Sequence, residues 1–265
     1  MEKMFSAGTA YESYMGRWSR LLAPKFIAFT GVREGDRVLD VGTGTGSLAS
    51  SLDHALRTID IVAIDPSEGF IGFAQKSSPS RRIRFERGDA QALPFPDRSF
   101  DDAMALLVLN FVPDHRKAVA EMRRVTRPQG RVGACVWDYA AGMQSLRIFW
   151  DEVVALDPAM APKDERNMKL SHEGELAALW KAAGLLEVEE RPLAVEQRFA
   201  SFEDYWAPFL EGTGPGGAYV ASLSEPQRAE LAARLKRRLL RDRADGPFTL
   251  EAAAWCVKGS VPKGP

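Results

Sequence analysis

Apolar and polar positions follow two periods along the chain, and together they predict an α/β protein. Short apolar runs typical of buried strands are expected near residues 37–41, 60–64, 83–87, 101–108 and 131–137. Between them, apolar residues recur every three or four positions, which predicts helices near 46–55, 67–76, 115–126 and 144–156, with a short turn at 91–93. Alternation of this kind builds a parallel sheet with helices on both faces.

The same periods continue outside this region. Aromatic and aliphatic residues at helical spacing predict a helix over 9–30, and further elements are expected at 172–183 (helix), 186–197 (strand) and 252–259 (strand). Residues 200–246 separate the last two strands and contain a glycine-rich stretch and a Leu/Ala/Arg-rich helix. Compact domains seldom use so many residues on one connection without a purpose. We therefore interpret 200–246 as a mobile helical lid over a substrate, hinged at the glycines of 212–217.

The first strand runs directly into a glycine-rich turn, V-L-D-V-G-T-G-T-G, at residues 38–46. Glycine permits a sharp turn and brings bare N–H groups against a ligand. The next strand ends at Asp65, nineteen residues after Gly46. A carboxylate at the tip of the second strand of a βαβ unit is placed to accept hydrogen bonds from both ribose hydroxyls of an adenosine ligand. The two features predict a cofactor that contains a nucleoside.

The spacing of the glycines separates two classes of cofactor. In the dinucleotide fingerprint G-x-G-x-x-G the third glycine would fall at position 47, which is Ser47. The chain reads D-x-G-x-G-x-G instead, with Asp40 ahead of the first glycine. An acid there suits an ammonium group, as in the methionine end of S-adenosylmethionine, better than a pyrophosphate. An NAD-dependent oxidoreductase is kept as an alternative.

Four motifs in a fixed order carry a resemblance to a known family. Besides V-L-D-V-G-T-G-T-G and A-I-D-P-S, the chain contains G-D-A-Q-A-L-P-F-P-D-R-S-F-D at 88–101 and R-V-T-R-P-Q-G-R-V at 124–132. Over roughly 36–137 it resembles the class I S-adenosylmethionine-dependent methyltransferases, in the branch of the ubiquinone/menaquinone biosynthesis methyltransferases (methyltransferase type 11). The resemblance implies a Rossmann-like, seven-stranded, mostly parallel sheet with helices on both faces. Its last strand would be antiparallel and at the edge.

The resemblance and the long connection at 200–246 together suggest a division of the chain. Residues 1–35 would form an N-terminal helical cap, 36–199 with 247–265 the methyltransferase domain, and 200–246 the lid inserted before the last strand.

Cofactor contacts follow from the same resemblance. Asp40 would face the ammonium group of S-adenosylmethionine, Asp65 its ribose hydroxyls and Asp89 its adenine amino group. Arg17 would reach the carboxylate of the cofactor's methionine part. Each acid could instead cap its own turn, and Arg17 could lie in solvent. Leu106 stands where relatives often present a polar residue, so only apolar or backbone contact is expected there. The expected cofactor-binding set is Tyr14, Arg17, Asp40, Gly42, Thr43, Gly44, Thr45, Gly46, Asp65, Pro66, Ser67, Asp89, Ala90 and Leu106.

Evidence for the acceptor side comes from residues after the fourth and fifth strands and from the lid. His115 is the only histidine near the predicted cleft and is the candidate catalytic base, although P-D-H-R-K-A is also an ordinary helix start with Asp114 as its N-cap. Aromatic residues fit a flat or apolar acceptor, and core packing of the lid would explain them equally well. The expected acceptor-binding residues are Asn110, Phe111, Trp137, Tyr205, Trp206 and Phe209.

Composition narrows the partners and the location. The 265 residues carry a formal net charge of −1, so no overall attraction to nucleic acid or an anionic membrane is expected. Cys135 and Cys256 are the only cysteines, and their spacing favours neither a metal site nor a disulfide framework. Neither an apolar signal segment nor a run of membrane-spanning length is visible. A cytoplasmic monomer or homodimer without a bound metal is expected.

The sequence as a whole predicts an S-adenosylmethionine-dependent methyltransferase that methylates O, N or C of a small organic molecule by in-line displacement. Catalysis would rest mainly on positioning, because the cofactor already supplies an activated carbon. A nucleic-acid or protein methyltransferase and a non-catalytic S-adenosylmethionine-binding protein are the alternatives.

Overall fold

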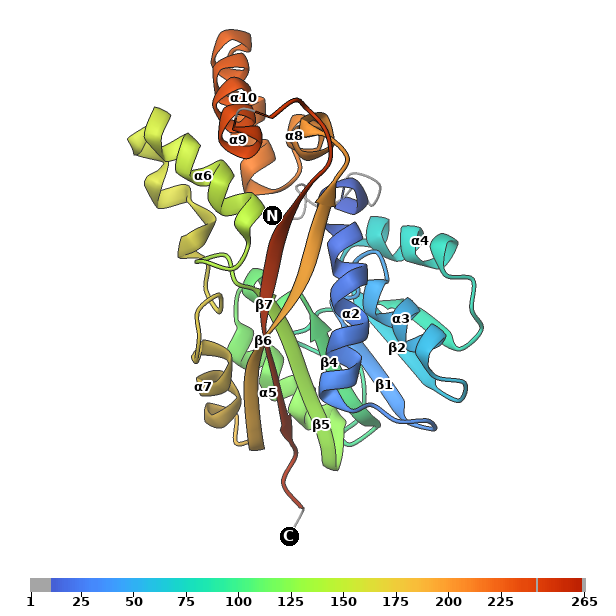
Figure 1. Ribbon diagram of the computed structural model, residues 1–265. Helices are drawn as coiled ribbons and strands as arrows, with labels where there is room; N and C mark the ends of the chain where they lie inside the picture. Colours follow the sequence, from blue (N-terminus) through green and yellow to red (C-terminus); the bar gives the residue numbers. More distant parts are fainter. Residues whose placement is uncertain (1–10, 242, 264–265) are drawn as a thin grey trace.

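The computed structural model describes residues 11–241 and 243–263 (Figure 1). Part of the expected N-terminal cap, residues 1–10, lies outside the described residues, and so do the first two positions of the helix expected over 9–30. Residue 242 of the lid segment and the terminal residues 264–265 also lie outside them. No helix among the described residues is long and apolar enough to cross a membrane.

A seven-stranded sheet forms the centre of the molecule, in the order β3-β2-β1-β4-β5-β7-β6. Strands β1 to β5 are parallel, whereas β7 pairs antiparallel with both β5 and β6. The strands are β1 (Arg37–Val41), β2 (Asp60–Asp65), β3 (Ile83–Arg87), β4 (Phe100–Leu106), β5 (Thr126–Trp137), β6 (Leu186–Phe199) and β7 (Phe248–Ser260). Strand order reverses between β1 and β4, and open α/β sheets bind ligands at the carboxyl ends of the strands at such a point.

Helices cover both faces of the sheet, with α2 and α3 on one face and α5 and α7 on the other (Figure 1). A short π-helix, η2 (Glu12–Gly16), leads into α2. The α-helices are α2 (Arg17–Thr30), α3 (Ser47–Ala55), α4 (Glu68–Ser77), α5 (His115–Val125), α6 (Gln144–Leu156), α7 (Glu175–Ala182), α8 (Phe202–Leu210), α9 (Gly214–Ser222) and α10 (Glu225–Leu240). Three 3₁₀ turns complete the set: η3 (Leu109–Phe111), η4 (Pro158–Lys163) and η5 (Glu165–Asn167).

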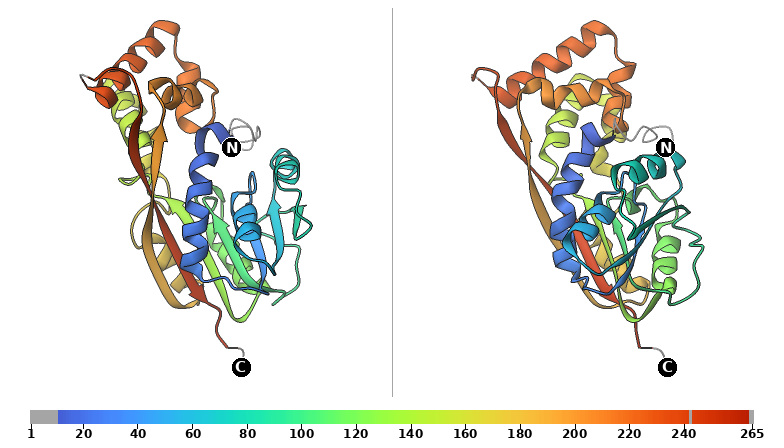
Figure 2. Two further views of the ribbon diagram at one scale, coloured as in Figure 1. Left: turned by 45° about the vertical axis from the view of Figure 1, so that its right-hand side comes forward. Right: turned by 90° about the vertical axis from the view of Figure 1, so that its right-hand side faces the viewer.

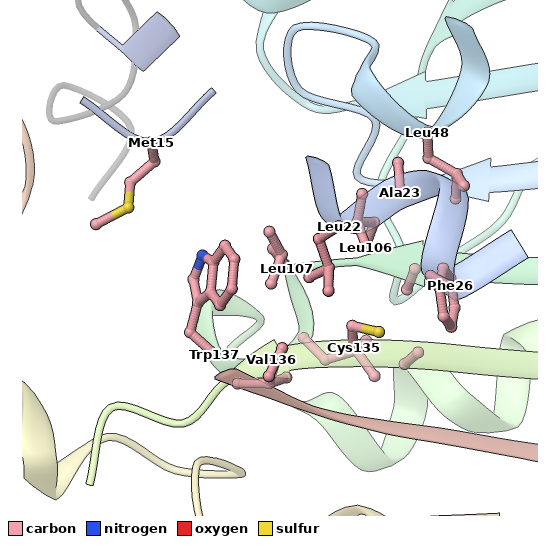
Figure 3. Packing of buried hydrophobic residues seen from close by; sticks show 14 of the residues in the cluster. Met15, Leu22, Ala23, Phe26, Leu48, Leu106, Leu107, Cys135, Val136 and Trp137 are labelled. Atoms are coloured by element: carbon pink, nitrogen blue, oxygen red, sulfur yellow. The ribbon is translucent and has the colours of Figure 1, made fainter. Parts of the chain in front are cut away.

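The core beneath the site consists of apolar side chains from α2 and the central strands. Leu22 and Phe26 of α2 lie over Leu106, Leu107 and Cys135 (Figure 3). All five side chains are buried. Burying a side chain of the size of leucine or phenylalanine stabilises a fold by about 1.5–3 kcal/mol, so this contact fixes α2 above the carboxyl ends of β4 and β5.

Strands β6 and β7 continue past the sheet as a long two-stranded ribbon. Their pairing runs from Leu186 opposite Ser260 to Phe199 opposite Phe248. The far end of the ribbon carries α8, α9 and α10, which lie beside α6 (Figures 1 and 2). The described part of the segment 200–246 is therefore helical, as the sequence predicts, and it contains three helices.

The expected fold class is confirmed, including the antiparallel last strand, but its expected place at the edge is wrong. Strand β7 lies between β5 and β6, and β6 forms the edge. The hydrophobic pattern locates a strand in the chain, but pairing in the folded molecule decides its neighbours. The turn expected at 91–93 is present without helical structure, and Asp89 and Ala92 form a short antiparallel contact there.

The expectation that the two cysteines, Cys135 and Cys256, do not support a disulfide is also wrong. The two residues face each other directly on β5 and β7, and their sulfur atoms form a disulfide. They are separated by 121 positions in the sequence. Only the register of β5 against β7 brings them together, which is why their spacing along the chain did not predict the bond.

Candidate functional site

A cavity of about 440 Å³ opens at the carboxyl edge of the sheet, around the point where strand order reverses. Pockets for small molecules typically have volumes of about 300–1,000 Å³. Residues at the ends of β1, β2, β4 and β5 and residues that follow β3 line this cavity, and η2 and α2 cover it. The elements of the βαβ core thus meet the N-terminal helices at one site.

The glycine-rich turn after β1 forms the floor of the cavity. Gly42 and Gly44 have left-handed φ angles of 72° and 54°, which side chains with a Cβ atom rarely adopt. A Cβ atom on Gly42 would overlap the side chain of Val108, whereas one on Gly44 would meet nothing within 4 Å. Thr43 and Thr45 line the cavity beside them, but Gly46 does not and instead stands at the N-cap position of α3. The open side of Gly44 therefore leaves room for a ligand against the backbone.

Asp40, at the base of this turn, is a fully buried carboxyl with one unused oxygen. Its Oδ2 atom accepts hydrogen bonds from Thr43 Oγ1 at 2.7 Å and from the Ala49 backbone N–H at 3.2 Å. Oδ1 has no hydrogen-bond partner among the residues that the structure describes. Burial raises the pKa of Asp40 to about 7. A cationic ligand group in the cavity would stabilise the charged form, because a nearby opposite charge offsets the cost of burial.

Asp65, the last residue of β2, also lines the cavity and is 7% exposed. Its two oxygens accept hydrogen bonds from the backbone N–H groups of Ser67 at 2.9 Å and Gly44 at 3.0 Å. Burial raises the pKa of this carboxyl. Each carboxylate oxygen can accept about two hydrogen bonds, so the carboxylate of Asp65 orders the turn and still has acceptor capacity for ligand hydroxyls.

Asp89 follows β3 and lines the cavity with Ala90. Its Oδ1 atom accepts hydrogen bonds from the backbone N–H and the side-chain amide of Gln91, at 2.8 and 3.2 Å. The alternative that Asp89 caps its own turn is therefore correct, and it is compatible with a ligand contact. Pro66, Ser67 and Leu106 lie along the same cavity.

The structure places Arg17 away from the cavity, unlike the sequence expectation. Its Nη1 atom donates to Asp204 Oδ1 in α8 at 2.7 Å, and the guanidinium lies over the rings of Trp18 and Phe199. Tyr14, three residues earlier, does line the cavity, and its hydroxyl has no hydrogen-bond partner among the described residues. One turn of helix therefore separates a cavity residue from one that joins the N-terminal helix to α8.

His115 does not reach the cavity either. It is the first residue of α5, and Asp114 caps that helix by accepting the Lys117 N–H at 2.9 Å. Burial, and then the positive charges of Lys169 and Arg116, lower the pKa of His115. The interpretation of P-D-H-R-K-A as an ordinary helix start is the one that the geometry supports.

The expected acceptor-binding residues divide into two groups. Phe111 and Trp137 line the cavity, whereas Asn110 does not line it and donates to Met168 Sδ at 3.5 Å. The three expected aromatic residues of α8 pack against other elements instead: the ring of Phe209 stacks on Phe149 of α6 at 4.3 Å, and the Tyr205 hydroxyl donates to the Ser145 carbonyl of α6 at 2.9 Å. Of the lid segment, Pro215 lines the cavity. The α8 residues outside the cavity are Tyr205, Trp206 and Phe209.

Sequence reasoning missed one charged residue of the cavity wall. Glu165, in the 3₁₀ turn η5, is 4% exposed and lines the cavity. The surrounding P-K-D-E-R-N has the composition of an exposed charged loop, so no local signal marks it. Within the described residues, no group of three or more His, Cys, Asp or Glu side chains is arranged to hold a metal ion.

Comparison with known proteins agrees with this geometry. Residues 39–134 match a family model described as a methyltransferase domain. A demethylmenaquinone methyltransferase of Renibacterium salmoninarum is 35% identical over 151 residues, which cover 57% of this chain and 60% of the relative. The chain thus spans less than two thirds of that relative's length. An uncharacterised protein of Mycobacterium tuberculosis is 30% identical over 222 residues, 80% of each chain.

Solved structures give the same result for the fold. Haemonchus contortus phosphoethanolamine N-methyltransferase 2, in complex with S-adenosylmethionine, superimposes with a TM-score of 0.58 at 17% identity. The superposition covers 97% of this chain and 57% of that one. With its sheet order, its glycine-rich turn and its relatives considered together, the chain belongs to the class I S-adenosylmethionine-dependent methyltransferases.

Proposed function

We propose that this chain transfers a methyl group from S-adenosylmethionine to O, N or C of a small organic molecule in the described cavity. The observation that carries the proposal is the continuity of that cavity. It extends from Asp40 and Asp65, which suit an ammonium group and ribose hydroxyls, to Phe111 and Trp137, which suit an apolar acceptor. The relative that is named for demethylmenaquinone supports a small-molecule acceptor.

The residues of the cavity floor fit the cofactor. Asp40 Oδ1 is a buried acceptor to which none of the described residues donates, and a bound ammonium group would satisfy it. The open face of Gly44 would admit the cofactor against the backbone. Asp65 would hold the ribose hydroxyls, and Asp89 with the backbone of Ala90 would hold the adenine. When bound, S-adenosylmethionine supplies an activated methyl group.

The protein's own contribution would be alignment and exclusion of water. Well-aligned reactants can gain roughly 7–11 kcal/mol from proximity alone. The cover formed by Tyr14, Met15 and Ser19 closes one side of the cavity, and Pro215 reaches it from the lid. These contacts favour a site that is enclosed during methyl transfer.

We further propose that residues 200–246 act as a lid that opens for the acceptor, as a unit distinct from the cap at 1–35 and the catalytic domain at 36–199 and 247–265. Two observations support this division: α8 to α10 are carried at the end of the β6–β7 ribbon, and left-handed backbones occur at Gly212, between α8 and α9, and at Gly214, the first residue of α9. A cytoplasmic location and a monomeric or homodimeric state stay predictions.

Calorimetric titration with S-adenosylhomocysteine and with NADH tests the cofactor. We expect S-adenosylhomocysteine to bind and NADH not to bind, and the reverse result would contradict the proposal. Methyl transfer from S-adenosylmethionine to a panel of phenols, amines and quinols, followed by mass spectrometry, tests the activity. Cofactor binding without transfer to any small molecule would favour a non-catalytic binding protein, and transfer only to RNA or protein would favour the other alternative.

A further inference from the structure

The acceptor end of the cavity contains a buried carboxyl that the proposed function does not yet use. Glu165 lines the cavity, and its Oε2 atom accepts a hydrogen bond from the indole N–H of Trp150 at 2.7 Å. Burial raises the pKa of Glu165 to about 7. Near neutral pH such a group exchanges protons readily, and general bases are most effective when their pKa lies near the working pH.

Ion pairs of its two sequence neighbours, Asp164 and Arg166, fix the turn that carries Glu165 in the cavity wall. The neighbouring Asp164 caps η5 through the Arg166 N–H at 2.9 Å and accepts from Arg147 Nη2 at 2.5 Å. Arg166 donates in turn to Asp151 at 2.7 Å. Since Arg147, Trp150 and Asp151 occupy adjacent turns of α6, this one helix anchors the whole turn. A group with locked supporting contacts loses little freedom when it binds a ligand.

Two tyrosines share this end of the cavity with Glu165. Tyr14 and Tyr139 are 7% and 4% exposed, and both line the cavity. Burial raises the pKa of each hydroxyl, and the negative charge of Glu165 acts in the same direction, whereas a hydrogen bond with Asn110 acts in the opposite direction on Tyr139. Both hydroxyls therefore stay protonated and can donate hydrogen bonds. The Tyr14 hydroxyl has no partner among the described residues.

The carboxylate and one of the two tyrosine donors match the hydrogen-bonding groups of a neutral hydroxyl that keeps one lone pair for attack. A hydroxyl has one hydrogen to donate and two lone pairs. Its hydrogen can go to Glu165, one lone pair can accept from a tyrosine, and the other stays free to attack. A neutral amine has a single lone pair, which a tyrosine donor would occupy. The aromatic rings of Phe111 and Trp137 in the same cavity favour an aromatic frame around that hydroxyl.

We infer that the methyl acceptor is an aromatic hydroxyl compound and that Glu165 accepts the proton of its hydroxyl group. The inference rests on the proposed function. The hydroxyl oxygen forms a bond to the methyl carbon, the bond from that carbon to the sulfonium sulfur breaks, and its electron pair stays on sulfur. The hydroxyl proton goes to the carboxylate of Glu165, so an aryl methyl ether and S-adenosylhomocysteine leave the site.

A binding experiment without turnover tests the contact between Glu165 and the hydroxyl. 4-Nitrophenol is titrated into protein saturated with S-adenosylhomocysteine, so that Asp40 is already paired, in two buffers of different ionisation enthalpy. At about pH 8.5 the free phenol and Glu165 are both ionised, so binding in wild type is expected to take up about one proton, shared by the two groups. Glu165→Gln is expected to lose this uptake. Equal uptake in both proteins, or no binding of the phenol, would overturn the inference.

Control variants separate charge from packing. Glu173→Gln, at an exposed position outside the cavity, should behave like wild type. Glu165→Asp keeps an ionisable group and should keep the proton uptake even if its melting temperature falls. If wild type does not bind S-adenosylhomocysteine, the proposed function fails. If it does bind and the uptake does not depend on Glu165, only the present inference fails.

Turnover gives a second measurement. With S-adenosylmethionine, 2-naphthol should be methylated on oxygen and 2-naphthylamine should not react. Glu165→Gln should lower kcat by roughly 10²–10⁴-fold, the usual contribution of a general base, without changing the affinity for S-adenosylhomocysteine. Methylation of the amine alone, or a kcat of Glu165→Gln equal to that of wild type, would overturn the inference.

Discussion

Arg17 Nη1 lies 2.7 Å from Asp204 Oδ1 and so joins the helix before the first strand to the first helix of the lid segment. Asp204 also accepts the backbone N–H of Ala200 at 2.9 Å, so the same carboxylate orders the end of β6. The two residues are 187 positions apart in the sequence. The pair therefore connects the cover of the cavity to the segment that we propose opens above it.

This contact predicts a structural role for Arg17. Arg17→Ala should leave the affinity for S-adenosylhomocysteine unchanged, because the side chain lies outside the cavity. A double-mutant cycle with Asp204→Asn, followed by urea unfolding, should give a coupling free energy of roughly 0.5–1 kcal/mol, the upper range for partly exposed ion pairs. A large loss of cofactor affinity in Arg17→Ala would instead restore the carboxylate-binding role expected from the sequence.

Asp65 is predicted to hold the cofactor. Asp65→Ala should weaken binding of S-adenosylhomocysteine by roughly 1.5–3 kcal/mol, the range for hydrogen bonds to a charged group. Asp60→Ala is the matched control, since Asp60 begins the same strand and is exposed at its opposite end. Isothermal titration calorimetry measures both, and equal affinities for the two variants would contradict the ribose role.

Asp40 predicts a pH dependence of cofactor binding. Because burial raises its pKa to about 7, the carboxyl must lose a proton to pair with an ammonium group below that pH. Affinity for S-adenosylhomocysteine should therefore fall by up to about tenfold per pH unit below 7. Asp40→Asn should weaken binding and flatten this dependence. Titrations between pH 5.5 and 8.5 measure the slope, and an unchanged slope in the variant would assign it to another group.

Without ligand, the same carboxyl affects folding in the opposite sense. A folded-state pKa above the unfolded value means that the folded state binds the proton more tightly. The stability contributed by Asp40 is thus fully present below its ordinary pKa of 3.8 and is lost as pH rises through about 7. The free energy of unfolding of Asp40→Asn, measured in urea at several pH values, should lack this loss.

Replacement by alanine should have different effects on stability at Gly42, in the turn after β1, and at Gly72, in α4. Gly42→Ala should lower the melting temperature, because its Cβ would overlap Val108 and because φ is 72°. The strain of a left-handed non-glycine residue alone costs about 1–3 kcal/mol. Gly72→Ala is the control: it lies within α4 with nothing within 4 Å of its Cβ, so it should be neutral or stabilising by about 0.5–1 kcal/mol. Equal melting temperatures would contradict the described turn.

The pairing of Cys135 with Cys256 predicts that neither thiol is free. Protein denatured in urea in the presence of iodoacetamide, without a reductant, should gain no alkyl group. Protein reduced before the same treatment should gain two, as intact mass spectrometry will show. Two alkylated thiols without reduction would mean that the cysteines are opposed across the strands but unbonded.

The sequence alone was sufficient to predict which residues form the floor of the cavity. Asp40, Gly42 and Gly44 lie within one turn, and their conformations depend on near neighbours: Thr43 donates to Asp40, and Gly44 donates to Asp65 at the tip of the next strand. Short-range geometry of this kind repeats whenever a strand, a glycine turn and a helix follow each other. For the same reason, the expected strands and helices agree with the observed ones to within a few residues at most ends.

Only the tertiary structure decided which distant residues meet, both around the site and elsewhere in the fold. Arg17 and Asp204, Cys135 and Cys256, and Glu165 against Tyr14 are each brought together from positions more than a hundred residues apart. A charged loop such as P-K-D-E-R-N carries no mark of burial, because the contacts with α6 that turn Glu165 inward lie elsewhere in the chain. Local sequence sets backbone conformation, whereas the partner of a side chain depends on how distant elements pack.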